Sequence, residues 1–371
     1  MQTLFSRAVI LAIVFVVTAP SQFLAASPRR EKKKRDSDSQ MHAIEEATRL
    51  QIFLDNANFG PGRIDGRGGD FTKKALVLYR RSTGLPEAAT SDLKDASGID
   101  LSSVSPVFTT YTVTKEDAES VGELPSGPVA QAKVKWLPYK NLLEAIGEKF
   151  HSDPKFIKEL NPGKIDRLKA GDEIKAPNVK PFDLSSVKAI KAGEGIAAIV
   201  VNELGEEAER SEEAKQSAAG VDKKSKGGEG GKKEEAQPLT VHVSIKDSIL
   251  EVLAGEKVAA AFPVTVGSRQ TVSPIGNWTV RAIAKLPTFH YDLKMLNEGK
   301  RSSNAHLLPP GPNNPVGVMW IALNKKGIGI HGTNEPDSIG RSASHGCIRL
   351  ANWDVVKLAE MVRPGMHVTI E

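Results

Sequence analysis

The sequence contains a single cysteine, Cys347, and two of the eight histidines lie close to it. His331 begins the tripeptide His-Gly-Thr, and His345 stands in the run Ser-His-Gly-Cys-Ile-Arg-Leu, which starts at Ser344. A thiol attacks a carbonyl carbon as the thiolate, and an adjacent imidazole can lower its pKa or take its proton. These residue types predict a thiol nucleophile with a histidine base.

The segment between His331 and Cys347 is rich in residues that favour turns, among them Asn334, Pro336 and Gly340. A loop of this composition can return the chain and bring the two reactive side chains together. Gly332 leaves the backbone beside His331 uncrowded, so a carbonyl there could hold the imidazole in one tautomer. Gly346 can adopt backbone angles closed to other residues, which suits a turn whose N–H groups face a developing oxyanion.

Spacing alone leaves two other interpretations open. His331, His345 and Cys347 could be zinc ligands with Asp337 as the fourth, although the absence of a second thiol argues against this. Alternatively, Cys347 could be a buried, inert thiol beside histidines that are satisfied by hydrogen bonds.

Length and composition are those of an ordinary globular protein. A chain of 371 residues with 40% apolar and 26% charged residues predicts two or three domains. A basic run at 29–35 could touch an anionic wall or membrane surface, or it could be a solvated tail. No basic helix carries base-stacking aromatic residues, so we do not expect a nucleic-acid partner.

Residues 1–26 have the pattern of a secretory signal peptide. Arg7 precedes an apolar run at 8–19, and the small pair Ala25-Ala26 follows as a cleavage site. The apolar run is too short for a membrane span, so we expect export to the periplasm or cell wall without stable membrane insertion. Export of a chain with one cysteine leaves no intramolecular disulfide, and a lone thiol in an oxidising compartment is a liability unless it is buried or used, which favours a functional role for Cys347.

Residues 27–41 are charged and polar, and we expect them to be disordered. Two helical patterns then flank a glycine-rich loop at 59–66, and the second stops at Gly84-Leu85-Pro86. With its Gly-x-Ile-Asp-Gly loop, the stretch 42–87 resembles a peptidoglycan-binding helical domain, although Tyr79-Arg80 replaces the usual aromatic residue followed by Gln. The resemblance implies wall binding, and a spacer without binding is the alternative.

A strand at 111–113, an amphipathic helix near 142–150 and a strand near 168–174 organise the next region. Asp153-Pro154 is a helix start, with aspartate as the cap and proline at the first helical position. The stretch 109–180 resembles a LysM domain with its strand, two helices and strand. This resemblance implies binding to N-acetylglucosamine chains in peptidoglycan, and a structural brace is the alternative.

Residues 205–237 mix glutamate, lysine and glycine with almost no large apolar residue, which predicts a flexible linker or insertion. From 238 onward the alternation of apolar residues predicts strands, for example at 241–245, 249–253 and 261–266. One helix is expected at 353–362. The fold class is therefore a multidomain α+β protein with a mostly-β C-terminal domain at 238–371.

The C-terminal motifs resemble the L,D-transpeptidase catalytic domain of the YkuD type. They are His-Gly-Thr at 331–333, Ser-His-Gly-Cys-Ile-Arg-Leu at 344–350 and the stretches 273–278, 287–291 and 308–317. The resemblance implies a β-sandwich with a catalytic cysteine in a cleft, and neither metal nor cofactor. The implied roles are Cys347 as nucleophile, His331 as base and acid, Ser344, His345 and Gly332 as residues that shape the site, the N–H groups of Gly346 and Cys347 as the oxyanion hole, and Arg349, His290 and Tyr291 as substrate-binding residues.

The function implied by this resemblance is a peptidoglycan L,D-transpeptidase. It would join the third residues of two stem peptides through a cysteine thioester. With water as acceptor the same site would be an L,D-carboxypeptidase, and with a lysine of an envelope protein it would anchor that protein to the wall. A non-catalytic wall-binding scaffold is the alternative from another class.

Overall fold

The computed structural model describes residues 28–86, 96–189, 200–202, 237–267, 273–294, 302–325, 327–341, 344 and 346–371. The chain divides into two units, Met1–His42 and Ala43–Glu371, and every feature of the site below belongs to the second. The predicted signal peptide at 1–26 and nearly all of the predicted linker at 205–237 lie outside the described residues. Across the described ranges, no helix combines the length and the apolar character that a membrane crossing requires.

Helix α1 spans Pro28–Asn56 and therefore includes most of the segment for which we expected disorder, 27–41. The difference has a simple physical basis, since proline is favoured at the first helical position. The lysine, arginine, glutamate and glutamine residues that follow also have high helix propensity. Low hydrophobicity alone does not prevent a helix that continues into an apolar, packed segment.

The helical region predicted for 42–87 is present. It consists of the C-terminal part of α1 and α2, Asp70–Thr83, which flank the glycine-rich loop. Gly84 ends α2 in the left-handed conformation, with φ +71°, and its N–H donates to the carbonyls of Arg80 and Arg81. The predicted stop at Gly84 is therefore a C-terminal glycine cap.

The region 108–177 is built from a strand pair and short helices. Strand β1, Phe108–Thr112, pairs antiparallel with β2, Glu173–Pro177. Between them lie α3, Lys115–Glu119, α4, Pro128–Gln131, α5, Leu142–Lys149, α6, Pro154–Leu160, and η2, Ile165–Arg167, and α7, Leu184–Ala189, follows β2. The Asp153 side chain accepts from the Lys155 N–H, so α6 begins as the Asp-Pro pair predicts.

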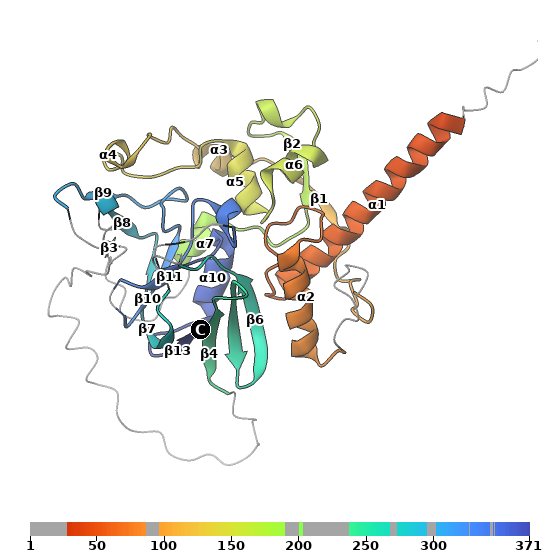
Figure 1. Ribbon diagram of the computed structural model, residues 1–371. Helices are drawn as coiled ribbons and strands as arrows, with labels where there is room; N and C mark the ends of the chain where they lie inside the picture. The colour runs from red at the N-terminus through yellow and green to blue at the C-terminus, as the bar shows by residue number, and fades with distance from the viewer. Residues whose placement is uncertain are drawn as a thin grey trace, which may run out of the picture. The chain divides into compact units, whose positions relative to one another are not determined.

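The C-terminal region is rich in β-sheet, as predicted (Figure 1). It contains an eight-stranded sheet in the order β12-β11-β10-β7-β13-β4-β5-β6. Its strands are β4, Leu239–Ser244, β5, Ile249–Ala254, β6, Lys257–Pro263, β7, Gly276–Lys285, β10, Met319–Leu323, β11, Gly329–His331, β12, Ile348–Arg349, and β13, His367–Ile370. A second sheet has the order β3-β8-β9, from Val200–Asn202, Thr288–Tyr291 and His306–Leu308. Helix η3, Pro336–Ser338, lies in the loop after β11, and α10, Asn352–Met361, follows β12.

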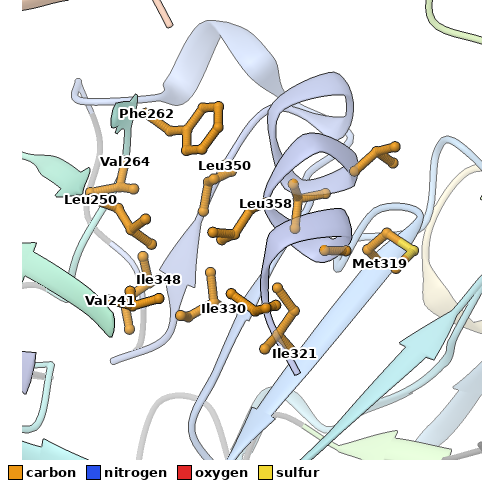
Figure 2. Packing of buried hydrophobic residues seen from close by; sticks show 14 of the residues in the cluster. Val241, Leu250, Phe262, Val264, Met319, Ile321, Ile330, Ile348, Leu350 and Leu358 are labelled. Atoms are coloured by element: carbon orange, nitrogen blue, oxygen red, sulfur yellow. The ribbon is translucent and has the colours of Figure 1, made fainter. Parts of the chain in front are cut away.

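The main hydrophobic core lies between the eight-stranded sheet and α10. In Figure 2, Ile330, Ile348 and Leu350 lie between Val241 of β4 and Leu358 of α10. All five side chains are fully buried. This packing fixes the end of β11, where His331 lies, and the start of β12, which directly follows Cys347.

The N-terminal helical region packs against the edge of this sheet. Leu50 and Leu54 of α1 share a buried cluster with Ile249 and Val258 of β5 and β6. Ala261 lies on the edge strand β6. Its N–H donates to the Asn58 carbonyl at 2.9 Å, and its carbonyl accepts from the Gly60 N–H at 2.7 Å. The loop after α1 thus covers backbone groups that an edge strand would otherwise leave open.

Candidate active site

His331 ends β11 and is completely buried. Its Nδ1 lies 2.6 Å from the carbonyl oxygen of Gly332. A carbonyl can only accept, so Nδ1 carries the proton and Nε2 keeps its lone pair. Among the residues that the structure describes, Nε2 has no hydrogen-bond partner, which leaves it able to accept a proton. The Gly332 carbonyl is thus in a position to orient the imidazole.

Trp320 fixes the plane of the His331 ring. The two residues are paired across β10 and β11, and their rings stack at 5.1 Å with an interplanar angle of 16°. Gly329, on the same face of β11, makes room for the indole, because a Cβ there would lie 2.5 Å from the Trp320 ring. The imidazole is therefore held by a ring face and by a backbone carbonyl.

The environment of His331 keeps the imidazole neutral. Burial lowers its pKa, and the positive charge of Arg349 lowers it further. The hydrogen bond to Gly332 works in the opposite direction, and the resulting pKa is about 3. At neutral pH the ring is thus a proton acceptor.

Cys347 directly precedes β12, the strand that pairs parallel with β11. The register aligns Ile330 with Ile348 and His331 with Arg349. The N–H of Leu350 extends the pairing by donating to the His331 carbonyl at 2.8 Å. The loop between the two motifs therefore returns the chain to the strand beside His331.

The thiol lies in a hydrophobic environment. Cys347 is 4% exposed, and its Sγ is 3.5 Å from the carbonyl oxygen of Gly327. It belongs to a group that we call the Cys347 cluster, whose buried members are Leu137, Ala284, Phe289, Leu308, Val316, Trp320, Ala322 and Cys347. Trp320 thus connects the two candidate catalytic residues, by stacking on His331 and by packing in the cluster of Cys347.

Ser344 shapes the turn before Cys347. Its hydroxyl donates to the Cys347 carbonyl at 2.5 Å and accepts from the Gly346 N–H at 3.2 Å. Its own N–H donates to the carbonyl of Val266, and Gly346 has φ +109°, a conformation that favours glycine. The Gly346 N–H, which we expected in an oxyanion hole, is therefore engaged by Ser344. His345 lies outside the described residues.

The candidate substrate residues are distributed unequally. Tyr291 of β8 packs against the Cys347 cluster, where its ring contacts that of the cluster member Phe289. His290 lies between them on the opposite face of the strand, because side chains alternate along a strand. Arg349 is half-buried beside His331, and its N–H and carbonyl exchange two hydrogen bonds of 2.9 Å with Thr265. The structure thus brings Tyr291 and Arg349 to the site, and not His290.

Sequence reasoning missed Asn352, a buried side chain at the first position of α10. Its Oδ1 accepts from the Val318 N–H at 3.2 Å. It also lies so close to Gly317 and Gly332 that a Cβ on either glycine would be 2.2 Å from it. Asn352 therefore supports the backbone that orients His331. The position of Asn352, three residues after Arg349, does not predict these contacts. They form only when α10 packs against the residues beside β10 and β11.

Three of the four candidate metal ligands can be placed, since His345 lies outside the described residues. Asp337 lies in η3 and forms an ion pair with Arg63. In the described part of the chain, no three histidine, cysteine, aspartate or glutamate side chains gather in a group suited to a metal ion.

Comparison with known proteins identifies the class. The family model for the L,D-transpeptidase catalytic domain, YkuD, matches residues 238–370. The chain is 33% identical over 135 residues to the putative L,D-transpeptidase YqjB of Bacillus subtilis, which covers 35% of this chain and 69% of that protein. It is 32% identical over 133 residues to the putative L,D-transpeptidase YkuD of Bacillus licheniformis, covering 36% of this chain and 66% of that protein. The chain belongs to the L,D-transpeptidase family, with a YkuD catalytic domain at its C-terminal end.

Other similarities cover smaller shares. The probable L,D-transpeptidase YbiS of Escherichia coli is 33% identical over 140 residues, which are 35% of this chain and 45% of that protein. Among solved structures, an L,D-transpeptidase from Mycobacterium smegmatis is similar at 19% identity, over 36% of this chain and 58% of that chain, with a TM-score of 0.29. The catalytic domain of the Enterococcus faecium L,D-transpeptidase is similar at 20% identity, over 37% of this chain and 99% of that chain, with a TM-score of 0.30. The chain thus spans just under two thirds of the Bacillus licheniformis YkuD and less than half of YbiS.

Proposed function

We propose that this protein is a peptidoglycan L,D-transpeptidase that joins the third residues of two stem peptides through a thioester on Cys347. The observation that supports it most directly is the state of His331. Its Nδ1 proton is bound by the Gly332 carbonyl. Among the described residues, Nε2 has no hydrogen-bond partner, and His331 ends the strand that pairs with β12, the strand directly after Cys347. A neutral imidazole held in that tautomer is the base that an acyl transfer by a thiol requires.

The first half-reaction transfers the acyl group to the enzyme. Nε2 of His331 takes the thiol proton while Sγ of Cys347 attacks the carbonyl carbon of the third stem residue. The tetrahedral intermediate collapses when the bond to the fourth residue, D-Ala, breaks and its nitrogen receives the proton from His331. A thioester between Cys347 and the donor stem remains.

The second half-reaction consumes the thioester. An amine of a neighbouring stem attacks the thioester carbonyl, His331 removes a proton from that amine, and the thiol of Cys347 is regenerated. Burial disfavours the imidazolium form, so His331 returns its proton readily in both half-reactions. Water as the acceptor gives a carboxypeptidase, and a lysine of an envelope protein gives a wall-anchoring transferase.

The remaining roles follow from position. Arg349 is suited to bind a stem carboxylate through its planar guanidinium, next to the base. Tyr291 contributes a wall of the acyl-donor site within the Cys347 cluster. The Cys347 N–H serves as an oxyanion donor, and the Gly346 N–H joins it when its long bond to Ser344 breaks.

We further propose that 1–26 directs export to the periplasm or cell wall. The stretches 42–87 and 109–180 would be a peptidoglycan-binding-like module and a LysM-like module, and the C-terminal sheets would form the sandwich of the family. Such modules would hold the enzyme on an immobile polymer and raise the local concentration of stems.

The test is to incubate purified sacculi with the protein and to identify the muropeptides by mass spectrometry. We expect new cross-links between third residues with the wild type and none with Cys347→Ala, which keeps the fold. Tripeptides without cross-links would indicate a carboxypeptidase instead. A protein that binds sacculi but leaves their muropeptides unchanged would be a scaffold, and the proposal would be wrong.

A further inference from the structure

A buried carboxyl group of the region between β1 and β2 is connected to the candidate active site. Glu148, near the end of α5, is 7% exposed. Its Oε1 accepts from the Tyr139 hydroxyl at 2.7 Å, and its two oxygens lie 3.1 and 3.2 Å from Nδ2 of Asn352. Glu148 and Asn352 are 204 positions apart in the sequence, so this contact joins the LysM-like region to the catalytic domain.

The carboxyl group determines which way the Asn352 amide faces. A carboxylate oxygen only accepts, so Nδ2 must point towards Glu148. Oδ1 then points towards β10, where it accepts from the Val318 N–H. The carbonyl of Pro312, 3.4 Å from Nδ2, favours the same orientation through a longer contact.

The Asn352 amide in turn fixes Gly332. The backbone of Gly332 is packed directly against Oδ1, with no space for a Cβ between them. The Gly332 N–H is held by the Met319 carbonyl at 3.1 Å, and the Gly332 carbonyl holds Nδ1 of His331. A displacement of Asn352 would therefore move the group that selects the tautomer and direction of the base.

We propose that Glu148 is a positioning residue for His331 and acts through Asn352 and the Gly332 backbone. The inference rests on the proposed function, because it assigns to His331 the role of the base. It makes the LysM-like region a part of the catalytic apparatus rather than only a wall-binding module. The catalytic domain alone would then hold His331 less firmly than the complete chain.

The electrostatics of Glu148 supply a distinctive readout. Burial raises its pKa, and the hydrogen bonds from Tyr139 and Asn352 only partly offset this, so the pKa is about 7. Glu144 on the same helix raises it further. A cavity of about 430 Å³ borders Glu148, and the other charged groups around it are Lys140, Glu335 and Asp337. Protonation removes one acceptor oxygen, so the hold on Asn352 weakens as the pH falls through about 7.

The experiment measures the rate constant with which a carbapenem acylates Cys347. The full chain is followed by intact-mass spectrometry at pH values between 5.5 and 8.5. Glu148→Leu removes the acceptor, and we expect acylation to slow by about tenfold or more, because small displacements of a catalytic group are costly. Glu148→Gln keeps an acceptor but does not titrate. The wild-type rate constant divided by the Glu148→Gln rate constant should therefore increase as the pH rises through 7.

Asp55→Asn is the matched control. Asp55 is also buried and also contacts α10, through Lys357, but it does not touch Asn352. We expect it to lower the melting temperature as much as Glu148→Leu does, while the acylation rate of the folded protein and its pH profile stay those of the wild type.

The outcomes separate the two proposals. If Glu148→Leu is acylated at the wild-type rate, or if the Glu148→Gln ratio is independent of pH, Glu148 has only a structural role and the inference is overturned. If the wild type itself is not acylated, or if Cys347→Ala is acylated equally, the proposed function fails first.

Discussion

Asp55 of α1 and Lys357 of α10 form a buried ion pair across 302 positions of sequence, with Oδ1 and Nζ 2.9 Å apart. The other oxygen of Asp55 lies 2.9 Å from Nδ1 of His151, whose ring stacks on Trp353. The N-terminal helices, the region between β1 and β2 and the catalytic domain thus meet at one carboxylate. The meeting point belongs to the same compact unit as the candidate active site.

Replacement of Asp55 by asparagine should destabilise the protein by about 3 kcal/mol, since it leaves the charge of Lys357 partly buried without its partner. Denaturation with urea, followed by circular dichroism, measures the loss. Arg67→Ala is the control, because Arg67 and Glu159 form an exposed pair, with side chains 59% and 50% accessible, and should contribute little. Equal losses in the two variants would contradict this account.

Asp55 also predicts how the fold responds to acid. Burial opposes ionisation, but His151 and Lys357 outweigh it and hold the pKa of Asp55 well below its usual range. A depressed carboxyl pKa gives stability that is present above the unfolded value, near 3.8, and is lost as the pH falls below it. Urea unfolding between pH 2.5 and 5 should show a steeper loss in the wild type than in Asp55→Asn.

Glu148 and Asp354 predict the opposite response near neutrality. Burial raises their pKa values to about 7 and about 8. A raised carboxyl pKa means that the folded state binds the proton more tightly than the unfolded state does. The stabilisation from Glu148 is therefore complete at low pH and is lost as the pH rises from about 4.5 to 7. The shift corresponds to about 3 kcal/mol for Glu148. Melting temperatures between pH 5 and 8 should fall more steeply in the wild type than in Glu148→Gln or Asp354→Asn, and parallel slopes would argue against a buried, protonated carboxyl.

Local signals in the sequence predicted much of the fold. Alternating apolar residues located β4 and β5, the Asp153-Pro154 pair located the start of α6, and Gly84 located the end of α2. These features succeed because each depends on neighbours within a few positions. The turn-rich segment after His331 also predicted that the chain would return, and the register of β11 and β12 shows how it does so.

The contacts between regions could not be predicted. Glu148 lies in a helix whose pattern gives no reason to bury a carboxylate, and its partner Asn352 reads only as a helix start. Trp320 reads as an ordinary strand residue until the pairing places it against His331. Such roles depend on which distant segment packs against the residue, and a linear pattern carries no information about that. The predicted linker at 205–237 suggested a catalytic domain separate from the regions before it, whereas α1, α5 and α10 meet around buried side chains.

Gly332→Ala tests the support of the base from the other direction. The added Cβ would lie 2.2 Å from Oδ1 of Asn352, so either Asn352 or the Gly332 carbonyl must move. We expect acylation of Cys347 to slow by about a hundredfold with a smaller loss of stability, because the carbonyl that orients His331 is displaced. Gly69→Ala provides the comparison, since in the described part of the chain no neighbouring residue lies within 4 Å of the added Cβ, and it should leave the rate unchanged. A wild-type rate in Gly332→Ala would show that the carbonyl contact is dispensable.

A last prediction concerns the segment between α4 and Pro138, which contributes Leu137 to the Cys347 cluster. Leu137 is fully buried in that cluster, its N–H donates to the Pro310 carbonyl at 2.9 Å, and its carbonyl accepts from the Asn313 N–H at 3.2 Å. Gly311 permits this approach, because a Cβ there would be 2.2 Å from the Leu137 carbonyl oxygen, and its φ is +147°.

Gly311→Ala should therefore separate the segment from the loop and expose one side of the Cys347 cluster. We expect a loss of about 2 kcal/mol from backbone strain and broken contacts. Hydrogen exchange should increase at the N–H groups of Leu137 and Asn313 but not at those of β4 and β5. Leu137→Ala is the companion variant, since it keeps both backbone hydrogen bonds and removes only the buried side chain. If the segment forms a wall of the acyl-donor site, both variants should raise the KM for a stem tetrapeptide, whereas an unchanged KM in both would limit the segment to a role in stability.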